Sequence, residues 1–292
     1  MVTIDTLPDD VLLEIFDHHL CGVRQEGYQY QSNQRAEEAW QSLVHVCHRW
    51  RSIVFESPRR LDLWLVCTGR TPARDKLDVW PTLPLIVEAI FSDSIRLGSM
   101  ENVIAALKRT DRVCQINLST IESLEMKIFL AAMQQPFPEL THLHLRPNHE
   151  TVVLPDSFLG GSAPRLEDLK LVAIPFPGLP KLLLSATHLT DLALVHIPHS
   201  GYFSRDAIAT VLPTLTSLDS FDLEFISIRS CPDRASRRPP PSTRPILPVL
   251  THFVFKGASE YLEDLVARID APQLKNLFIT FFNDFVFSTL HN

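Results

Sequence analysis

The chain has 292 residues, 45% of them hydrophobic, which is enough apolar material for the packed core of one elongated domain or two average ones. Its formal net charge is −7, which argues against a general nucleic-acid-binding protein because phosphate contacts need a basic surface. The sequence has no apolar run as long as a membrane span, and its five cysteines are scattered in the manner of reduced thiols. We therefore expect a protein of the cytoplasm or nucleus with no nucleic-acid or membrane partner.

The first segment with a clear pattern is 7–16, which predicts a short amphipathic helix. Pro8 fits the first turn of a helix, where its missing N–H is not needed, and Asp9 and Asp10 place negative charge at the positive end of the helix dipole. The apolar stripe of this helix consists of Val11, Leu12, Ile15 and Phe16.

The segment 22–34 is polar and has no helical or strand period, so it is interpreted as a loop. A second helix is expected to begin near Arg35 and to end at Ser57-Pro58. Its apolar stripe consists of Trp40, Leu43, Val44, Cys47, Trp50 and Val54.

The two helical segments resemble an F-box, a motif whose helices bind the Skp adaptor of a cullin–RING ubiquitin ligase. The resemblance rests on Leu7-Pro8-x-x-Val11-Leu12-x-x-Ile15-Phe16 and on Val46-Cys47-His48-Arg49-Trp50-Arg51. It implies that residues 1–58 form an F-box-like helical domain, with a polar insert near 22–34. The adaptor surface implied by the resemblance consists of Leu7, Pro8, Leu12, Ile15, Val46, Cys47 and Trp50.

A repeated template dominates the rest of the chain. The stretches Leu61–Cys67 and Leu83–Val87 read as strands separated by the long connection 68–81, and apolar residues at positions one, four and six then recur seven times. The copies start at residues 113, 140, 166, 189, 218, 250 and 274, which are 27, 26, 23, 29, 32 and 24 residues apart. Most of these steps fall within the period of roughly 20–29 residues that is typical of leucine-rich repeats.

The segments between the copies predict the second side of such repeats. Pro175–Lys181 is too rich in proline for a helix and is expected to cross in an extended path, while the basic, proline-rich segment 234–245 is expected to be an inserted surface loop. The ninth position is commonly Asn in such repeats, but here it is Asn only at Asn148, so we expect the turns to be held by apolar packing. Helical spacing is found in Glu101–Arg109, Leu124–Gln134, Arg205–Leu212 and Glu260–Ile269.

Further stretches resemble a fungal family, the basidiomycete F-box proteins with irregular leucine-rich repeats. They include Leu154–Pro164, Ile174–Pro180 and Tyr261–Pro272, and the resemblance extends over essentially the whole chain. It implies an α/β fold in which the F-box-like helices precede an irregular leucine-rich-repeat solenoid at 59–292. A parallel sheet would line its concave side, with helices and loops on the convex side.

In a solenoid of this kind, alternate residues of each strand face the concave side, because successive side chains of a strand point to opposite faces. Template positions three, five and seven would therefore form a surface for a target protein. The residues proposed for this surface are His142, His144, Arg146, Asp168, Lys170, Asp222, Glu224, His252 and Lys256.

Motifs of common enzyme classes are missing from the sequence, which has no glycine-rich phosphate loop, no Gly-x-Ser-x-Gly and no His-Glu-x-x-His. Zinc needs four ligands that converge as a tetrahedron, and Cys47 belongs to an apolar stripe, so the nearest candidates are interpreted as packed or solvated side chains. These candidates are His18, His19, Cys21, His45, Cys47 and His48. The sequence predicts a protein that is not an enzyme and uses no metal or cofactor.

Large apolar residues, most of them phenylalanines, crowd the last fifteen positions, and no polar repeat follows them. Repeat arrays normally need a polar terminal repeat to remain soluble, so we expect that another surface covers this end or that the gene product is truncated. The crowded residues are Phe278, Ile279, Phe281, Phe282, Phe285 and Phe287.

Together these observations favour a substrate-recruiting subunit of a Skp–cullin–F-box ubiquitin ligase. Its N-terminal helices would bind the adaptor, and its repeats would bind an unidentified target protein. The alternative is a repeat-based interaction scaffold, unrelated to ubiquitylation, in which the N-terminal helices cap the solenoid. Binding to the adaptor discriminates between the two.

Overall fold

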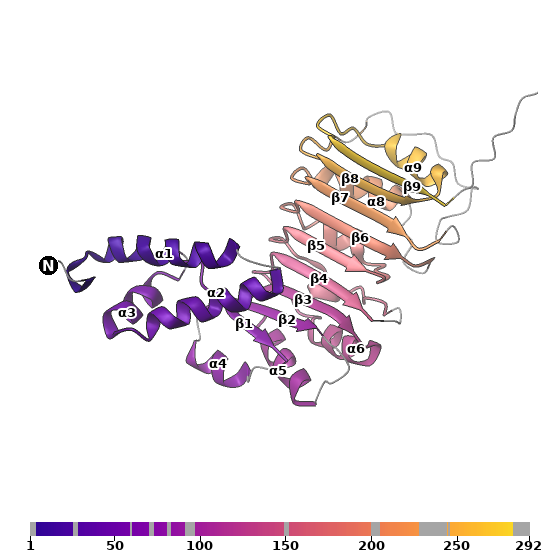
Figure 1. Cartoon of the computed structure of the whole chain (residues 1–292). Helices are drawn as coiled ribbons and strands as arrows, with labels where there is room; N and C mark the ends of the chain where they lie inside the picture. Colours follow the sequence, from indigo (N-terminus) through magenta and orange to yellow (C-terminus); the bar gives the residue numbers. More distant parts are fainter. Residues whose placement is uncertain are drawn as a thin grey trace, which may run out of the picture.

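The computed structural model describes residues 4–25, 29–58, 60–69, 73–80, 83–90, 97–148, 152–199, 205–227, 244 and 246–282. Within these ranges nine parallel strands form one open sheet, and their order in space is their order in the sequence (Figure 1). The predicted α/β class is confirmed, and the stack of parallel strands is compatible with a solenoid.

Each copy of the repeated template supplies one strand. Equivalent template positions pair across neighbouring strands, as in Leu143↔Leu169 and Leu169↔Leu192, so the apolar side chains of positions four and six stack in rows and most of them are buried. The two earlier strands begin a few residues later than predicted, at Leu65 and Leu85. The strands are β1 (Leu65–Thr68), β2 (Leu85–Ile90), β3 (Val113–Ile121), β4 (His142–Pro147), β5 (Asp168–Val172), β6 (Asp191–Ile197), β7 (Ser220–Phe225), β8 (His252–Gly257) and β9 (Asn276–Phe281).

Helices connect many of the strands, and the four predicted ones are confirmed to within a few residues. They are α5 (Leu97–Leu107), α6 (Ser123–Ala132), α8 (Arg205–Val211) and α9 (Ser259–Val266). The prediction of an extended path at Pro175–Lys181 is wrong in part, because the short helix α7 (Leu179–Leu183) begins there. Pro180 lies in the first turn of α7, where proline is tolerated, and Leu179, Leu182 and Leu183 are buried. A further short helix, α4 (Ala73–Val79), lies in the predicted connection between β1 and β2.

Three helices form an N-terminal lobe, α1 (Asp9–Gln25), α2 (Gln29–Val44) and α3 (His48–Glu56). The predicted loop at 22–34 is wrong, since 22–25 and 29–34 are helical; glutamine, arginine, glutamate and alanine favour helix at the start of α2 even without an apolar period. The predicted single second helix is also wrong. It breaks at His45–Val46, and Cys47 has extended backbone angles before α3 begins.

Aromatic side chains join the lobe to the connection between β1 and β2, where Trp80 follows α4. The Trp40 ring of α2 lies 5.5 Å from Trp80 and 6.4 Å from Phe55, measured between ring centroids. The apolar core continues without a break from α1 through the sheet to α9. Figure 1 shows the lobe projecting from the β1 end of the sheet, with α2 reaching over the first strands.

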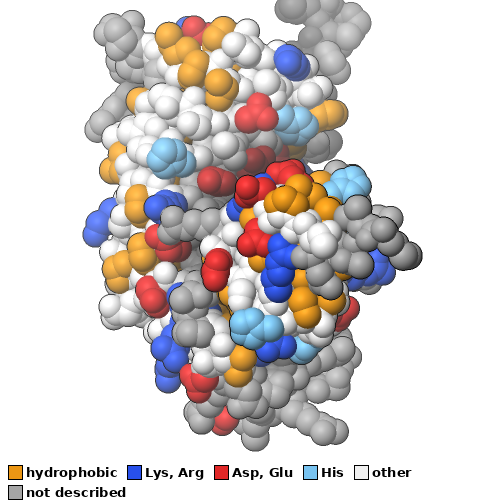
Figure 2. All heavy atoms as spheres, turned by 90° about the vertical axis from the view of Figure 1, so that its left-hand side faces the viewer, with side chains coloured by type: hydrophobic (Ala, Val, Ile, Leu, Met, Phe, Trp, Pro, Cys, Tyr) orange, Lys and Arg blue, Asp and Glu red, His pale blue; other side chains and the backbone are white. Residues whose placement is uncertain are grey.

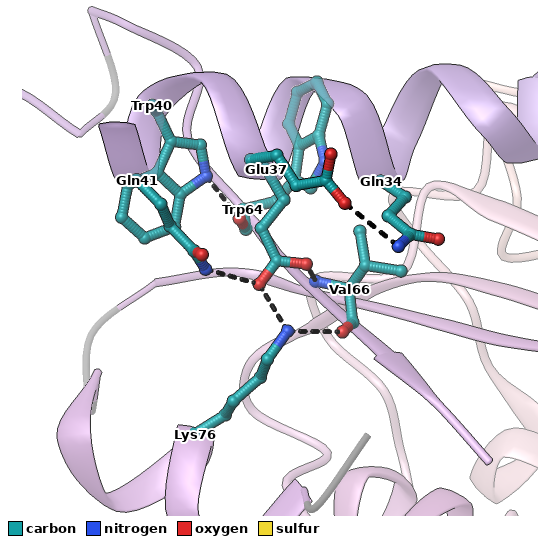
Figure 3. Close-up of polar contacts among 8 residues, drawn as sticks. Gln34, Glu37, Trp40, Gln41, Trp64, Val66 and Lys76 are labelled. Atoms are coloured by element: carbon teal, nitrogen blue, oxygen red, sulfur yellow. Dashed lines mark hydrogen bonds and ion pairs between the residues drawn. The ribbon is translucent and has the colours of Figure 1, made fainter. Parts of the chain in front are cut away.

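Side chains from two helices occupy the outer edge of β1, which has no neighbouring strand among the described residues (Figure 3). Glu37 Oε2 accepts a hydrogen bond from Val66 N–H at 3.1 Å, and Trp40 Nε1 donates to the carbonyl of Trp64 at 3.1 Å. Lys76 of α4 completes the group, with its Nζ 3.5 Å from the carbonyl oxygen of Val66. Unpaired edge groups of a sheet invite pairing with other chains, and here side chains satisfy them.

An unusual backbone recurs at the ends of three strands, within β3 and β6 and directly after β5. Thr120, Ala173 and His196 each occupy the eighth template position and have φ of 55°, 57° and 56°, in the left-handed region. The predicted apolar packing of the ninth position is confirmed where Ile121, Ile174, Ile197 and Ala258 are buried, but it is wrong at Ile226, which is exposed.

Some predictions concern residues outside the described ranges. They are the basic loop 234–245, apart from the exposed Arg244, and the aromatic residues Phe285 and Phe287. In the described part of the C-terminal region, Leu277, Phe278 and Ile279 of β9 are exposed. None of the helices in the described ranges is long and apolar enough to cross a membrane.

Candidate binding surfaces

The face of the sheet that carries template positions three, five and seven is here called the open face. Its side chains are mostly polar and half-buried or exposed, because the apolar side chains of positions four and six point to the opposite face, into the core. Register places equivalent residues in rows across the strands, at a spacing of about 4.8 Å per strand. One row runs Glu88, Asn117, His144, Lys170, and the row beside it runs Ile86, Gln115, His142, Asp168, Asp191.

A cavity of about 230 Å³ lies between the first of these rows and the N-terminal half of α2. Asn33 of α2 forms part of its wall, where its Nδ2 donates to Glu88 Oε1 at 2.7 Å. The cavity brings together four residues predicted from the sequence as target-binding, namely His142, His144, Asp168 and Lys170. It also includes the amides Gln115 and Asn117.

Glu88 is the most buried charged group of this cavity, with 2% of its surface exposed. The pKa of its carboxyl is raised to about 7, mainly by burial; the hydrogen bond from Asn33 opposes this shift, and nearby Glu37 adds to it. The second oxygen, Oε2, is buried and has no hydrogen-bond partner. An unsatisfied buried polar atom costs about 1–3 kcal/mol, so this oxygen is a place where a ligand donor would gain.

Two histidines of β4 lie next to each other along the cavity wall. Burial lowers the pKa of His144 to about 4, and the positive charges of Lys170 and Arg146 add to this effect, so the imidazole is neutral near pH 7. Its Nε2 is buried without a hydrogen-bond partner. The Nδ1 of His142 lies 2.9 Å from Thr141 Oγ1.

The other predicted target-binding residues are farther along the sheet and do not line this cavity. Arg146 is exposed at the end of β4, and Asp222, Glu224, His252 and Lys256 are half-buried on β7 and β8. Burial raises the pKa of Asp168 and of Asp222, and neighbouring carboxylates add to both shifts. The open face is therefore not one continuous pocket.

Sequence reasoning missed Glu88 and Asn33. Glu88 was detectable as a lone carboxylate in the apolar run Leu85–Ile90, but the predicted strand ended before it. Asn33 lies in the segment that was interpreted as a loop.

The N-terminal lobe divides the motif residues between its core and its surface. Leu12 is fully buried (0% exposed), so its predicted role as an adaptor contact is wrong for the folded lobe. It shares a helix face with Phe16, whereas Val11 and Ile15 lie one residue earlier, about 100° around the helix. Ile15 and Val46 are 43% and 58% exposed, and Val11 and Pro8 are also exposed.

The remaining motif residues are half-buried where α1 meets α3. The rings of Phe16 and Trp50 lie 4.7 Å apart, and Arg49 Nη2 donates to the carbonyl of Leu7 and to Asp9 Oδ1, both at 2.5 Å. Leu7, Cys47 and Trp50 are each partly accessible. Figure 2 shows hydrophobic side chains among charged ones on this end of the molecule.

Among the described residues, no three His, Cys, Asp or Glu side chains are arranged to hold a metal ion. No protein-family model matches the chain, and no curated protein matches it either.

Proposed function

We propose that the chain is the substrate-recruiting subunit of a Skp–cullin–F-box type ubiquitin ligase. The N-terminal lobe binds the Skp adaptor, the open face of the sheet binds a target protein, and the chain itself catalyses no reaction. The observation that carries this proposal is the exposure of Ile15 and Val46, two apolar residues of the F-box-like motif, on the surface of the lobe.

The division within the motif supports an interaction role. Leu12 and Phe16 are buried and fix α1 in the lobe, which leaves Val11 and Ile15 with no part in its core. Exposed apolar side chains that gather on one part of a surface mark interaction sites more often than chance. By this proposal the adaptor covers Pro8, Val11, Ile15 and Val46, while Trp50 contributes its accessible edge.

The open face supplies the second half of the proposal. Its cavity under α2 contains buried polar atoms without partners, and the repeated strands hold these atoms on a rigid frame. Such a frame suits recognition of a protein segment. A ligase of this kind acts in the cytoplasm or nucleus.

The direct test is a pull-down of the full chain with a purified Skp-type adaptor. Ile15→Asp and Val46→Asp introduce charge at exposed positions, so we expect both to abolish retention while the circular dichroism spectrum stays unchanged. Leu124→Asp is the matched control, since Leu124 is an exposed apolar residue of α6, outside the lobe. Absence of binding by the unaltered chain, or equal binding by all three variants, would refute the proposal.

The second candidate function is a protein-interaction scaffold unrelated to ubiquitylation, in which the N-terminal helices cap the repeats. The contacts of Glu37, Trp40 and Lys76 with the edge of β1 favour it, because they give α2 a structural role that needs no adaptor. Complexes isolated from cells distinguish the two functions. A scaffold is recovered without adaptor or cullin, whereas a ligase subunit is recovered with both.

A further inference from the structure

The open face between β2 and β7 is rich in carboxylates and poor in cations. Among the described residues of this stretch, Lys170 and Arg146 are the basic side chains other than histidine. No ion pair of the described residues involves any of the acidic ones. The acidic side chains are Glu88, Asp168, Asp191, Asp222 and Glu224.

Among these carboxylates, Glu88 provides a defined position for a cation. Glu88 lines the cavity; Asn33 donates to its Oε1, while its Oε2 is buried without a hydrogen-bond donor. A positively charged N–H group placed in the cavity would supply both the missing donor and the counter-charge. Hydrogen bonds between ionised partners are the strongest of the ordinary kinds.

The other groups of the cavity do not repel a cation that lies beside Glu88. His144 lies two strands from Glu88 in the same row and is neutral near pH 7, so it brings no opposing charge. Lys170 lies three strands from Glu88, roughly 14 Å between backbones, and forms no ion pair with it. Asp168, in the adjacent row, adds a second carboxylate to the wall.

We propose that this cavity binds a lysine or arginine side chain from a basic segment of the target protein, with Glu88 as its counter-ion. The remaining carboxylates of the open face attract the basic residues on either side. The proposal rests on the target-binding role proposed above and specifies the chemistry of the target.

The test uses the full chain and a fluorescein-labelled Gly/Ser nonapeptide that carries three arginines, with fluorescence anisotropy as the readout. A twin peptide replaces each arginine by citrulline, which keeps the shape of the side chain and removes its charge. We expect the citrulline twin to bind at least about tenfold more weakly, as expected for the loss of a buried charge pair. Equal binding of the two peptides would overturn the proposal.

Three variants locate the site. Glu88→Gln removes the counter-ion, so we expect the arginine peptide to bind this variant at least about tenfold more weakly. Asp191→Asn removes an exposed carboxylate of the same face that does not line the cavity, and we expect a change of no more than about twofold. Equal losses in these two variants would show diffuse attraction and would reject the cavity.

Lys170→Gln tests the sign of the charge on the ligand. Lys170 is exposed, so we expect the fold to tolerate this substitution. A cationic ligand binds this variant more tightly, because a repelling charge has been removed. Weaker binding, together with preference for a peptide carrying glutamate in place of arginine, would overturn the proposal in favour of an anionic ligand. No adaptor is present in the assay, so a chain that retains the adaptor but ignores the arginine peptide refutes this inference alone.

Discussion

Lys76 Nζ lies 2.6 Å from Glu37 Oε1, and both side chains also contact the backbone of Val66 at the outer edge of β1 (Figure 3). The two residues come from different helices, α4 and α2, and are 39 positions apart in the sequence. Glu37 is 3% exposed, so Lys76 and the amide donors around it replace the water that its side chain would otherwise bind. This pair joins the N-terminal lobe to the sheet.

We expect Glu37→Ala to lower the free energy of unfolding by about 3–5 kcal/mol, because it leaves Lys76 and the Val66 N–H without their partner. Glu38→Ala is the matched control. Glu38 is the next residue of α2, but it is exposed and bonds only to the side chain of Gln34 in the described contacts, so a change within about 0.5 kcal/mol is expected. Urea unfolding followed by circular dichroism measures both, and equal stabilities would contradict the prediction.

Leu12 and Val11 are neighbours in the motif but differ in environment. Leu12→Ala removes a fully buried side chain and should cost about 2–5 kcal/mol of unfolding free energy. Val11→Ala removes an exposed one and should change stability by less than about 0.5 kcal/mol. Tryptophan fluorescence during urea unfolding reports on both variants through Trp40 and Trp50. A small loss in Leu12→Ala would show that Leu12 is not part of the core.

Glu88 makes the stability of the ligand-free protein depend on pH. Its pKa is about 7 in the folded state, against an ordinary value of 4.5, so the folded state holds a proton that the unfolded state has released between these two values. The contribution of Glu88 to the free energy of unfolding is therefore greatest at acidic pH. It falls by up to about 3 kcal/mol as the pH rises to about 7.

The groups that face Glu88 are Asn33 and Glu37 of α2, Thr68 of β1 and Asn117 of β3. Glu88→Gln removes the titrating proton, so we expect this variant to be more stable than the unaltered chain at about pH 8 and to lack this fall. Urea unfolding at several pH values gives the comparison. A variant with the same pH dependence as the unaltered chain would exclude Glu88 as the cause.

His196 lies in the left-handed region, at φ 56°, next to the last residue of β6. A non-glycine residue there costs roughly 1–2 kcal/mol, which exceeds the entropy of about 0.5–1 kcal/mol lost by glycine on folding. His196→Gly should therefore raise the melting temperature. His188→Gly, at an exposed turn position shortly before β6 where φ is not positive, should lower it. Differential scanning calorimetry tests the pair, and a lower melting temperature for both would contradict the assignment.

The strands of the template were predictable from the sequence because their signal is local. The spacing of the leucines at Leu166–Leu171 or Leu189–Leu194 predicts both the strand and which of its faces is buried. The break at Val46 was not predictable in this way. The apolar stripe continues in phase from Trp40 to Trp50, so one long helix and two shorter helices would show the same pattern in the sequence.

The cavity was only partly predictable. His142, His144, Asp168 and Lys170 follow from their template positions, but their partner Glu88 precedes the recognisable copies. The contact between Asn33 and Glu88 spans 55 residues and depends on how α2 lies over the sheet, which no local pattern records. The same holds for Leu12, whose burial depends on which side of α1 packs against the rest of the lobe.

The agreement between strand order and chain order has a consequence for biosynthesis. Each strand pairs with the one translated immediately before it, so a nascent chain can add strands one repeat at a time without waiting for distant sequence. The residues that close the edge of β1, on α2 and α4, are translated before β2. The growing sheet is therefore sealed on its first side at the outset, and it elongates in the direction in which the ribosome supplies the chain.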